Sequence, residues 1–147
     1  MSLPAFAQES APSGLSDDTV IEELHSCVLE AIHTNDDGKQ DAKTVAANAV
    51  ESCDGEAKAA SKVATQGQDA AHYATFYAAL KTGDYFVPAV TEERRIRADV
   101  DSTRAQFGAK AYDTAMERFK AANDAGKSDE ADHWTRVAVR LKAGTSN

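Results

Sequence analysis

Apolar residues recur at helical spacing along most of the chain, and this pattern predicts its secondary structure. Residues 16–33 place their apolar side chains on one side of the helical period, with Ser16 as N-cap and carboxylates in the first turns. Later stripes predict helices at about 41–65, 68–82, 91–106, 109–124 and 128–142. We therefore predict an all-α bundle of five to six antiparallel helices, with a helical hairpin at each end of the chain.

One stripe changes face within what would otherwise be a single long helix. From Asp41 to Ala64 alanines carry the apolar face, whereas beyond residue 70 aromatic side chains carry it on roughly the opposite side. Glycine is unfavourable in a helix interior. We therefore predict a break near Gly67, with Gly55 as a weaker candidate.

Residues 83–90 (GDYFVPAV) are predicted to be the main interior linker. Gly83 is suited to cap the preceding helix, because glycine readily adopts the left-handed conformation that follows many helix ends. Pro88 is expected to push Val87 into an extended conformation. The next helix would then begin near residue 91.

The only two cysteines, Cys27 and Cys53, lie on the buried stripes of the first two predicted helices. In an antiparallel hairpin, residues equidistant from the turn face one another, and the midpoint of this pair, residue 40, lies at the end of the predicted turn at 34–40. A disulfide is therefore predicted, and it would stabilise the fold by about 3.5 kcal/mol. The alternative is two small core residues in a reducing compartment.

The length of 147 residues indicates one domain large enough for a real core. We expect a flexible N-terminal arm at 1–15, a single helical domain at 16–143 and a tail at 144–147. No apolar run is long enough to span a membrane.

The first residues contain Ala5-Phe6-Ala7 before Gln8, which has the small-x-small form of a signal-peptidase site. A basic region and a longer apolar stretch, which an export signal needs, do not accompany it. Two accounts fit: the end of a trimmed export signal, or a polar arm that begins at Met1. The first agrees with a disulfide, so an exported compartment (periplasm, lumen or extracellular) is the expected location.

Charge is unevenly divided along the chain. Residues 1–90 carry 14 acidic and 5 basic side chains, a net charge of −9, whereas residues 91–147 carry 10 acidic and 11 basic ones, a net charge of +1. Nucleic acids and anionic membranes are bound through Lys and Arg, so the acidic part argues against both as partners. A protein partner with a basic surface fits better.

No residue pattern points to catalysis, a cofactor or a metal. All four histidines follow a carboxylate by three residues, a spacing that di-iron helical bundles use. The predicted faces of His25, His33 and His72 do not converge, so pairing along a helix explains the spacing better. We expect no metal, no cofactor and no enzymatic activity.

Half of the aromatic residues cluster at one helix end and the following linker. These five residues are Tyr73, Phe76, Tyr77, Tyr85 and Phe86. They could fill the core beside the alanine-rich hairpin. Alternatively, they could form a patch that anchors a partner, since aromatic side chains are frequent hot spots of interfaces.

These observations lead to two hypotheses for the function. The first is a non-enzymatic helical interaction or structural subunit of a larger protein assembly, which uses the acidic N-terminal region and the aromatic cluster as contacts. The alternative is a free-standing soluble protein of an exported compartment, such as a periplasmic binding or inhibitor protein.

Overall fold

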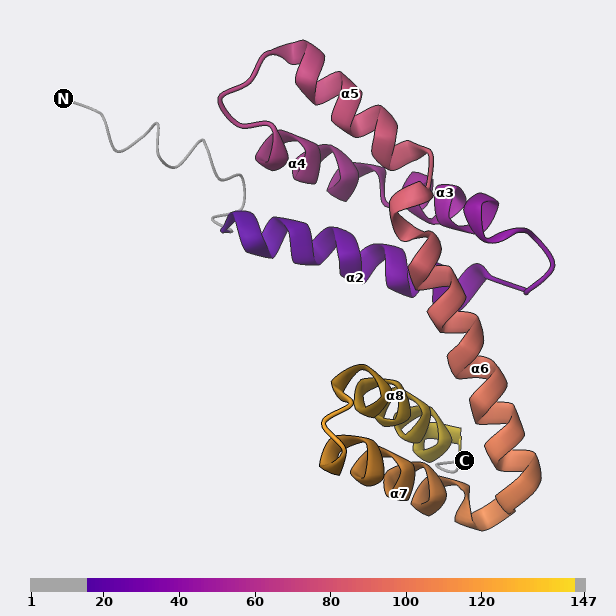
Figure 1. Ribbon diagram of the computed structural model, residues 1–147. Helices are drawn as coiled ribbons and strands as arrows, with labels where there is room; N and C mark the ends of the chain where they lie inside the picture. Colours follow the sequence, from indigo (N-terminus) through magenta and orange to yellow (C-terminus); the bar gives the residue numbers. More distant parts are fainter. Residues whose placement is uncertain (1–15, 145–147) are drawn as a thin grey trace. The chain divides into compact units, whose positions relative to one another are not determined.

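The computed structural model describes residues 16–144, which are mostly helical (Figure 1). Its elements in chain order are α2 (Asp17–Asn35), α3 (Ala42–Ser52), α4 (Asp54–Ala64), α5 (Ala70–Lys81), η1 (Asp84–Phe86), α6 (Val87–Phe107), η2 (Gly108–Lys110), α7 (Ala111–Asp124) and α8 (Ser128–Gly144). No β-strand occurs within these residues, so the predicted all-α fold is confirmed. The predicted arm at 1–15 and residues 145–147 of the predicted tail lie outside the described residues.

Packing divides the chain between Thr91 and Glu92 into two compact units. Unit 1 comprises α2 to α5, η1 and the start of α6, and unit 2 comprises the rest of α6 with α7 and α8. Each has its own apolar core, with Val28, Ile32, Val50 and Phe86 in unit 1, and Ile96, Val100, Val137 and Leu141 in unit 2. That the two units behave as the single domain expected at 16–143 stays a prediction.

A disulfide joins Cys27 of α2 to Cys53, which lies between α3 and α4, with their Cα atoms 6.0 Å apart. Cys53 is buried and Cys27 is half-buried against the unit 1 core. The helix that carries Cys27 begins as predicted, because the side chain of Ser16 accepts a hydrogen bond from the backbone N–H of Thr19 at 3.2 Å. The N-terminal helical hairpin clasped by a disulfide is thus confirmed.

The predicted break near Gly67 is confirmed. Residues 65–69 separate α4 from α5, and Gly67 has a φ of 78°, which favours glycine. The stretch before it, predicted as one helix, is interrupted a second time, at Cys53 rather than at Gly55. There the backbone N–H of Cys53 bonds to Val50 three residues back. A one-residue interruption leaves the alanine spacing almost intact, so the periodicity did not reveal it.

The connection from α5 to α6 is shorter than predicted. Gly83 does have the expected left-handed conformation, but η1 follows at once and α6 begins at Val87. Val87 is helical, with φ −55° and ψ −44°, so its predicted extended conformation is wrong. Pro88 instead occupies the first turn of α6, where a missing N–H costs no intrahelical hydrogen bond.

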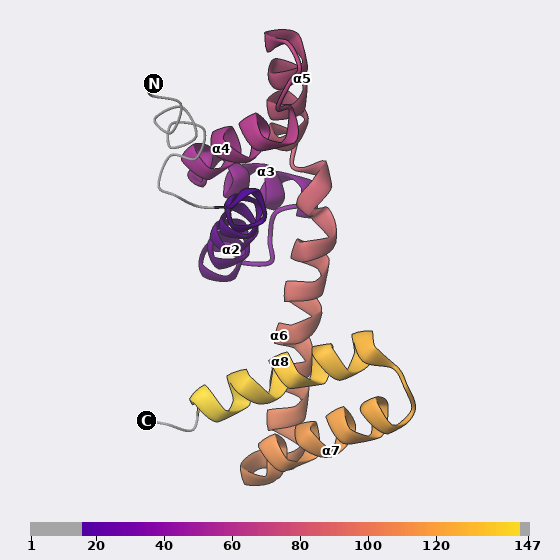
Figure 2. The same cartoon turned by 90° about the vertical axis from the view of Figure 1, so that its left-hand side faces the viewer.

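In unit 2, α7 and α8 lie side by side and form the predicted C-terminal hairpin (Figures 1 and 2). Their turn is closed by Gly126, with a φ of 73°, and by a hydrogen bond of 2.9 Å from the backbone N–H of Lys127 to the carbonyl of Ala122. This is a Schellman-type end, in which glycine removes the steric penalty of the left-handed residue. The turn therefore holds Lys127 in a defined place at the end of the hairpin.

Candidate partner-binding groove and buried polar network

The five clustered aromatic residues have three different environments in unit 1. Phe86 is buried in the core. Tyr73 and Tyr77 are half-buried, and their rings stack with centroids 6.1 Å apart. Phe76 and Tyr85 are exposed, at 37% and 63% of their surfaces. The core-filling alternative thus describes Phe86, while Phe76 and Tyr85 are available to a partner.

Helix α5 is apolar on all sides, with the sequence AAHYATFYAALK, yet Leu80 is its only buried residue. A helix that is apolar all round is normally buried in a core. Here all five alanines and Phe76 are exposed, so much of its apolar surface faces outward. This mismatch between composition and burial is the most unusual feature of unit 1.

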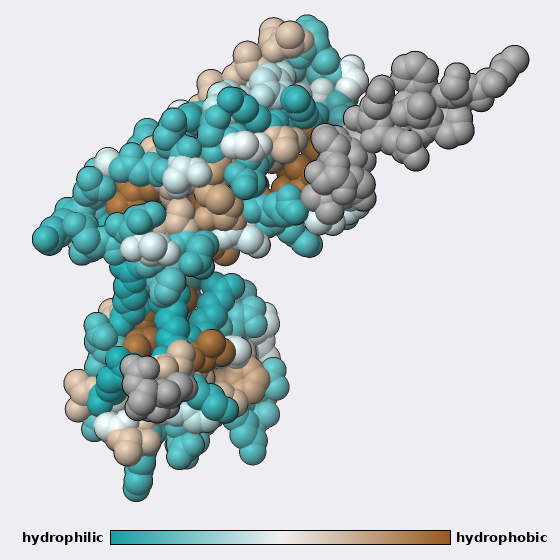
Figure 3. Space-filling model, turned by 180° about the vertical axis from the view of Figure 1, so that it is seen from behind, coloured by the Kyte–Doolittle hydropathy of each residue, from teal (hydrophilic) through white to brown (hydrophobic). Residues whose placement is uncertain are grey.

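Two hollows meet at Phe76. The first, of about 620 Å³, lies between α2, α4, α5 and η1, and its lining includes Ile21, Leu24, Leu80 and Tyr85. The second, of about 610 Å³, lies between α4 and α5 and is lined by Thr65, Gln68 and several alanines. We call the two together the Phe76 groove. The space-filling view shows apolar side chains in recesses between polar ones (Figure 3).

Tyr85 is held in place although it is exposed. Its ring meets those of His25 and Phe86 edge to face, at centroid distances of 5.7 Å and 4.9 Å. Its hydroxyl lies 3.5 Å from Nε2 of His25. These contacts limit the entropy that Tyr85 would lose on binding, which favours it as an interface anchor.

The opposite side of α5 is fixed to α4 by polar contacts. The Tyr77 hydroxyl donates a hydrogen bond to Asp54, which also pairs with Lys58 at 2.8 Å. The hydrogen bond from Lys58, followed by that from Tyr77, lowers the pKa of Asp54 below its ordinary value. Asp54 in turn raises the pKa of Tyr77. These bonds orient α5, so that the direction of Phe76 is set by the fold.

The groove belongs to an acidic unit. Residues 16–91 carry 13 carboxylates and 5 lysines, a net charge of −8. Asp84 and His25 lie among the residues that line the first hollow. Lys43 pairs with Asp84 at 3.2 Å, but both side chains are exposed, so the pair contributes little stability.

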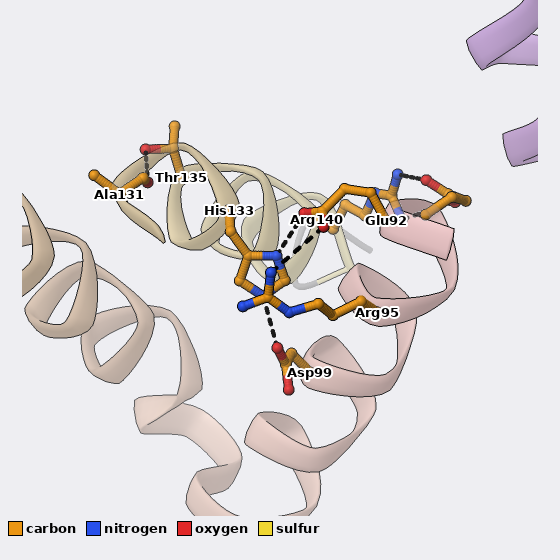
Figure 4. A network of polar contacts seen from close by, with 8 residues as sticks. Glu92, Arg95, Asp99, Ala131, His133, Thr135 and Arg140 are labelled. Carbon is orange, nitrogen blue, oxygen red and sulfur yellow. Dashed lines mark hydrogen bonds and ion pairs between the residues drawn. The ribbon is translucent and has the colours of Figure 1, made fainter. Parts of the chain in front are cut away.

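Unit 2 contains a different feature, a histidine buried between two carboxylates (Figure 4). His133 of α8 is 1% exposed, and its ring nitrogens lie 2.8 Å from Glu92 and 2.6 Å from Asp99, both on α6. Both nitrogens can donate only when the ring is protonated. The geometry therefore suits an imidazolium cation that joins α8 to α6.

A second polar contact lies next to it on the same two helices. Arg140 of α8 donates two hydrogen bonds to the carboxylate of Glu93, one of them 2.9 Å long. Arg97 donates to the same carboxylate at 3.0 Å. A bidentate Arg–carboxylate pair is the most directional kind of ion pair, so this contact fixes α8 relative to α6 within unit 2.

The sequence did not reveal this network. His133 follows Glu130 by three residues, which suggested a pair along one helix, but the partners are on α6. A signal was present, because Glu92 and Asp99 are seven residues apart and flank the predicted stripe through Ile96 and Val100. Which helix would meet that stripe could not be read from periodicity.

The network is suited to structure rather than to catalysis. His133 is shielded from solvent and both of its ring nitrogens are occupied, so no substrate atom reaches them in this arrangement. Within residues 16–144, no three His, Cys, Asp or Glu side chains are grouped so as to hold a metal ion. Among the predicted carboxylate–histidine pairs, Asp69–His72 does form a direct contact, at 2.7 Å, and it is on the surface.

Comparison with protein-family models, curated proteins and solved structures found no match to this chain. Among the described helices, none has the length and apolar character to cross a membrane.

Proposed function

We propose that the protein is a non-enzymatic interaction subunit that uses the Phe76 groove to bind the apolar face of a basic helical segment of a protein partner. The observation that carries this proposal is the composition of α5. Its apolar surface is exposed around Phe76, whereas a helix of this composition is normally covered. A partner would supply the missing cover.

The shape of the groove favours a helix as the bound element. Hollows of about 620 Å³ and 610 Å³ lie on the two sides of Phe76, so the apolar surface continues along α5. An amphipathic helix presents anchors at about every third or fourth residue, and two successive anchors could occupy the two hollows. Phe76 would pack between them.

The charge of unit 1 favours a basic partner. A net charge of −8 over residues 16–91 attracts positive charge over roughly a Debye length and speeds association. The apolar contact would provide the affinity, because surface charge pairs contribute little once formed. We therefore expect an association rate that falls with salt and a dissociation rate governed by Phe76 and Tyr85.

The test compares three forms of the full chain: wild type, Phe76→Ala/Tyr85→Ala, and Leu29→Ala. Leu29 is also an exposed apolar residue of unit 1, but it does not line the groove, so it controls for loss of surface apolarity. Proteins retained from native extract are identified by mass spectrometry, purified and titrated against each form. The double variant should weaken binding at least about tenfold, and Leu29→Ala by less than about twofold.

Equal binding to the wild type and the double variant would refute the groove as the interface. Circular dichroism first confirms that the double variant keeps its helices. A designed helix with leucines on one face and lysines on the other serves as a second probe, with a scrambled peptide of the same composition as its control. If both peptides bind equally, the attraction is only electrostatic and the proposal fails.

A second function is favoured by the disulfide, which is typical of oxidising compartments. In that case the protein is a free-standing exported binding or inhibitor protein, and the first hollow takes a small apolar ligand, for which its volume is suitable. Organic extraction of protein purified from its native source distinguishes the two. A stoichiometric apolar molecule supports this second function, and its absence together with a retained partner supports the first.

A further inference from the structure

The α7–α8 hairpin of unit 2 carries a hollow that the proposed function does not use. It is an open hollow of about 360 Å³, and its lining includes Arg118, Lys127, Glu130 and Trp134 together with three alanines. The alanines leave room near the two cations. The hollow thus combines small side chains with positive charge.

Arg118 is held by aromatic rings rather than by a carboxylate. Its guanidinium lies 4.7 Å from the ring centre of Trp134 and 5.6 Å from that of Phe107. Other arginines of this unit, such as Arg97 and Arg140, pair with Glu93. Within the described residues no carboxylate lies within ion-pair distance of Arg118. Its charge is thus oriented but not neutralised.

Aromatic contacts use the faces of a guanidinium, whereas its N–H donors point outward in its plane. These two ring contacts therefore restrict the guanidinium while its N–H donors are not taken up by a carboxylate. An oxyanion that enters the hollow could accept two hydrogen bonds from Arg118 in the bidentate manner that this side chain favours. Ordering the cation beforehand reduces the entropy lost on binding.

Lys127 provides a second cation at the same hollow. The Schellman-type turn fixes its backbone through the hydrogen bond to Ala122. Its Nζ lies 3.7 Å from Glu130, but the two side chains are 67% and 44% exposed, so their pairing is weak. The three ionised side chains of the lining, Arg118, Lys127 and Glu130, together carry a charge of +1.

We propose that this hollow binds a compact oxyanion, either a phosphate group or a carboxylate of a small molecule. Arg118 receives its oxygens in bidentate fashion and Lys127 adds a point charge. The alanines accommodate the part of the ligand next to the anion. The site is independent of the Phe76 groove, which lies in unit 1.

Trp134 is the only tryptophan of the chain and contacts Arg118, so its fluorescence is a direct reporter. The full chain is titrated with inorganic phosphate and, separately, with acetate, while sodium chloride keeps the ionic strength constant. A saturable change with either anion is expected. A response to phosphate alone assigns the site to phosphate groups, and a response to acetate alone assigns it to carboxylates.

The variants separate a site from general charge attraction. Arg118→Gln should weaken the binding of the anion that gives the saturable change by about tenfold or more, because at least one charge-assisted hydrogen bond is lost. Arg136→Gln removes the same charge from an exposed position on α8 and should leave binding within about twofold. Glu130→Gln should strengthen binding, because it removes the competing carboxylate.

Two results would overturn the proposal: no saturable change for either anion at millimolar concentrations, or an equal response in the wild type and Arg118→Gln. If Arg118→Gln alters the circular dichroism spectrum, Arg118→Lys replaces it. Lysine keeps the charge but not the bidentate geometry, so unchanged binding there also contradicts the proposal.

Discussion

Replacing His133 with leucine is expected to destabilise unit 2 by about 2–4 kcal/mol. Leucine can fill the buried space, but it leaves Glu92 and Asp99 without the ring nitrogens that lie 2.8 Å and 2.6 Å from them. Asp99 then has no ion-pair partner within the described residues, whereas Glu92 keeps Arg95 at 3.5 Å. The larger part of the effect should therefore come from Asp99.

The magnitude follows from the burial of the three groups. Removing one partner of a fully buried ion pair costs about 3–5 kcal/mol, because the other charge stays buried and unpaired. Here His133 is buried, but the side chains of Glu92 and Asp99 are 31% and 35% exposed, so water compensates part of the loss. The expected loss, about 2–4 kcal/mol, is therefore smaller than for a fully buried pair. A double variant, His133→Leu/Asp99→Asn, should recover about 1 kcal/mol or more.

Urea unfolding followed by Trp134 fluorescence measures this effect in unit 2, because Trp134 adjoins His133 with ring centroids 5.4 Å apart. The matched control is His72→Leu, since His72 pairs with Asp69 on the surface and its loss should change stability by less than about 0.5 kcal/mol. If His133→Leu also changes the free energy of unfolding by less than about 0.5 kcal/mol, the contacts of His133 with Glu92 and Asp99 do not stabilise unit 2, and the reasoning is refuted.

Three further predictions concern unit 1. Intact mass under non-reducing, alkylating conditions should show no free thiol, and two alkylated cysteines in natively sourced protein would refute the disulfide. Reduction of Cys27–Cys53 should lower the free energy of unfolding by about 3.5 kcal/mol, as measured in urea. Gly83→Ala should lower the free energy of unfolding by about 2–4 kcal/mol, because a Cβ at this position meets backbone atoms. Gly67 has a similar φ but lies in open space, so Gly67→Ala should cost only about 1 kcal/mol. Equal losses of stability in thermal unfolding would contradict the steric argument. Because its folded pKa is lowered, Asp54 contributes stability above the ordinary carboxyl pKa, and this is lost as the pH falls through the lowered pKa. Asp54→Asn should therefore make the free energy of unfolding depend less on pH between about pH 5 and about pH 3. An unchanged pH dependence would be evidence against the hydrogen bonds from Lys58 and Tyr77.

Local pattern was sufficient to predict most of the helices and the disulfide. The stripes around Cys27 and Cys53, and the change of face near Gly67, depend on neighbours within a few turns, which the sequence displays directly. The helical start of α6 was not foreseen because the restriction on Val87 before a proline is a preference, and here the Val87 N–H bonds to Asp84 within η1.

The candidate sites depend on contacts between distant parts of the chain, which periodicity does not contain. The clustering of aromatic residues was visible, but whether Phe76 or Phe86 would be buried depends on how α5 packs on α4 and α3 and how η1 packs on α3. Similarly, Arg118 and Trp134 are each unremarkable in the sequence. Their cation–π contact forms only once α7 and α8 form a hairpin.

The exposed apolar surface of α5 has a consequence for how the isolated protein behaves in solution. Apolar surfaces of this kind promote self-association, while the net charge of −8 on the same unit keeps copies apart by repulsion. Added salt screens that repulsion and equally screens the attraction to a basic partner. We therefore expect rising ionic strength to drive the purified protein toward aggregation while it slows capture of the partner, so that colloidal stability and recognition decline together.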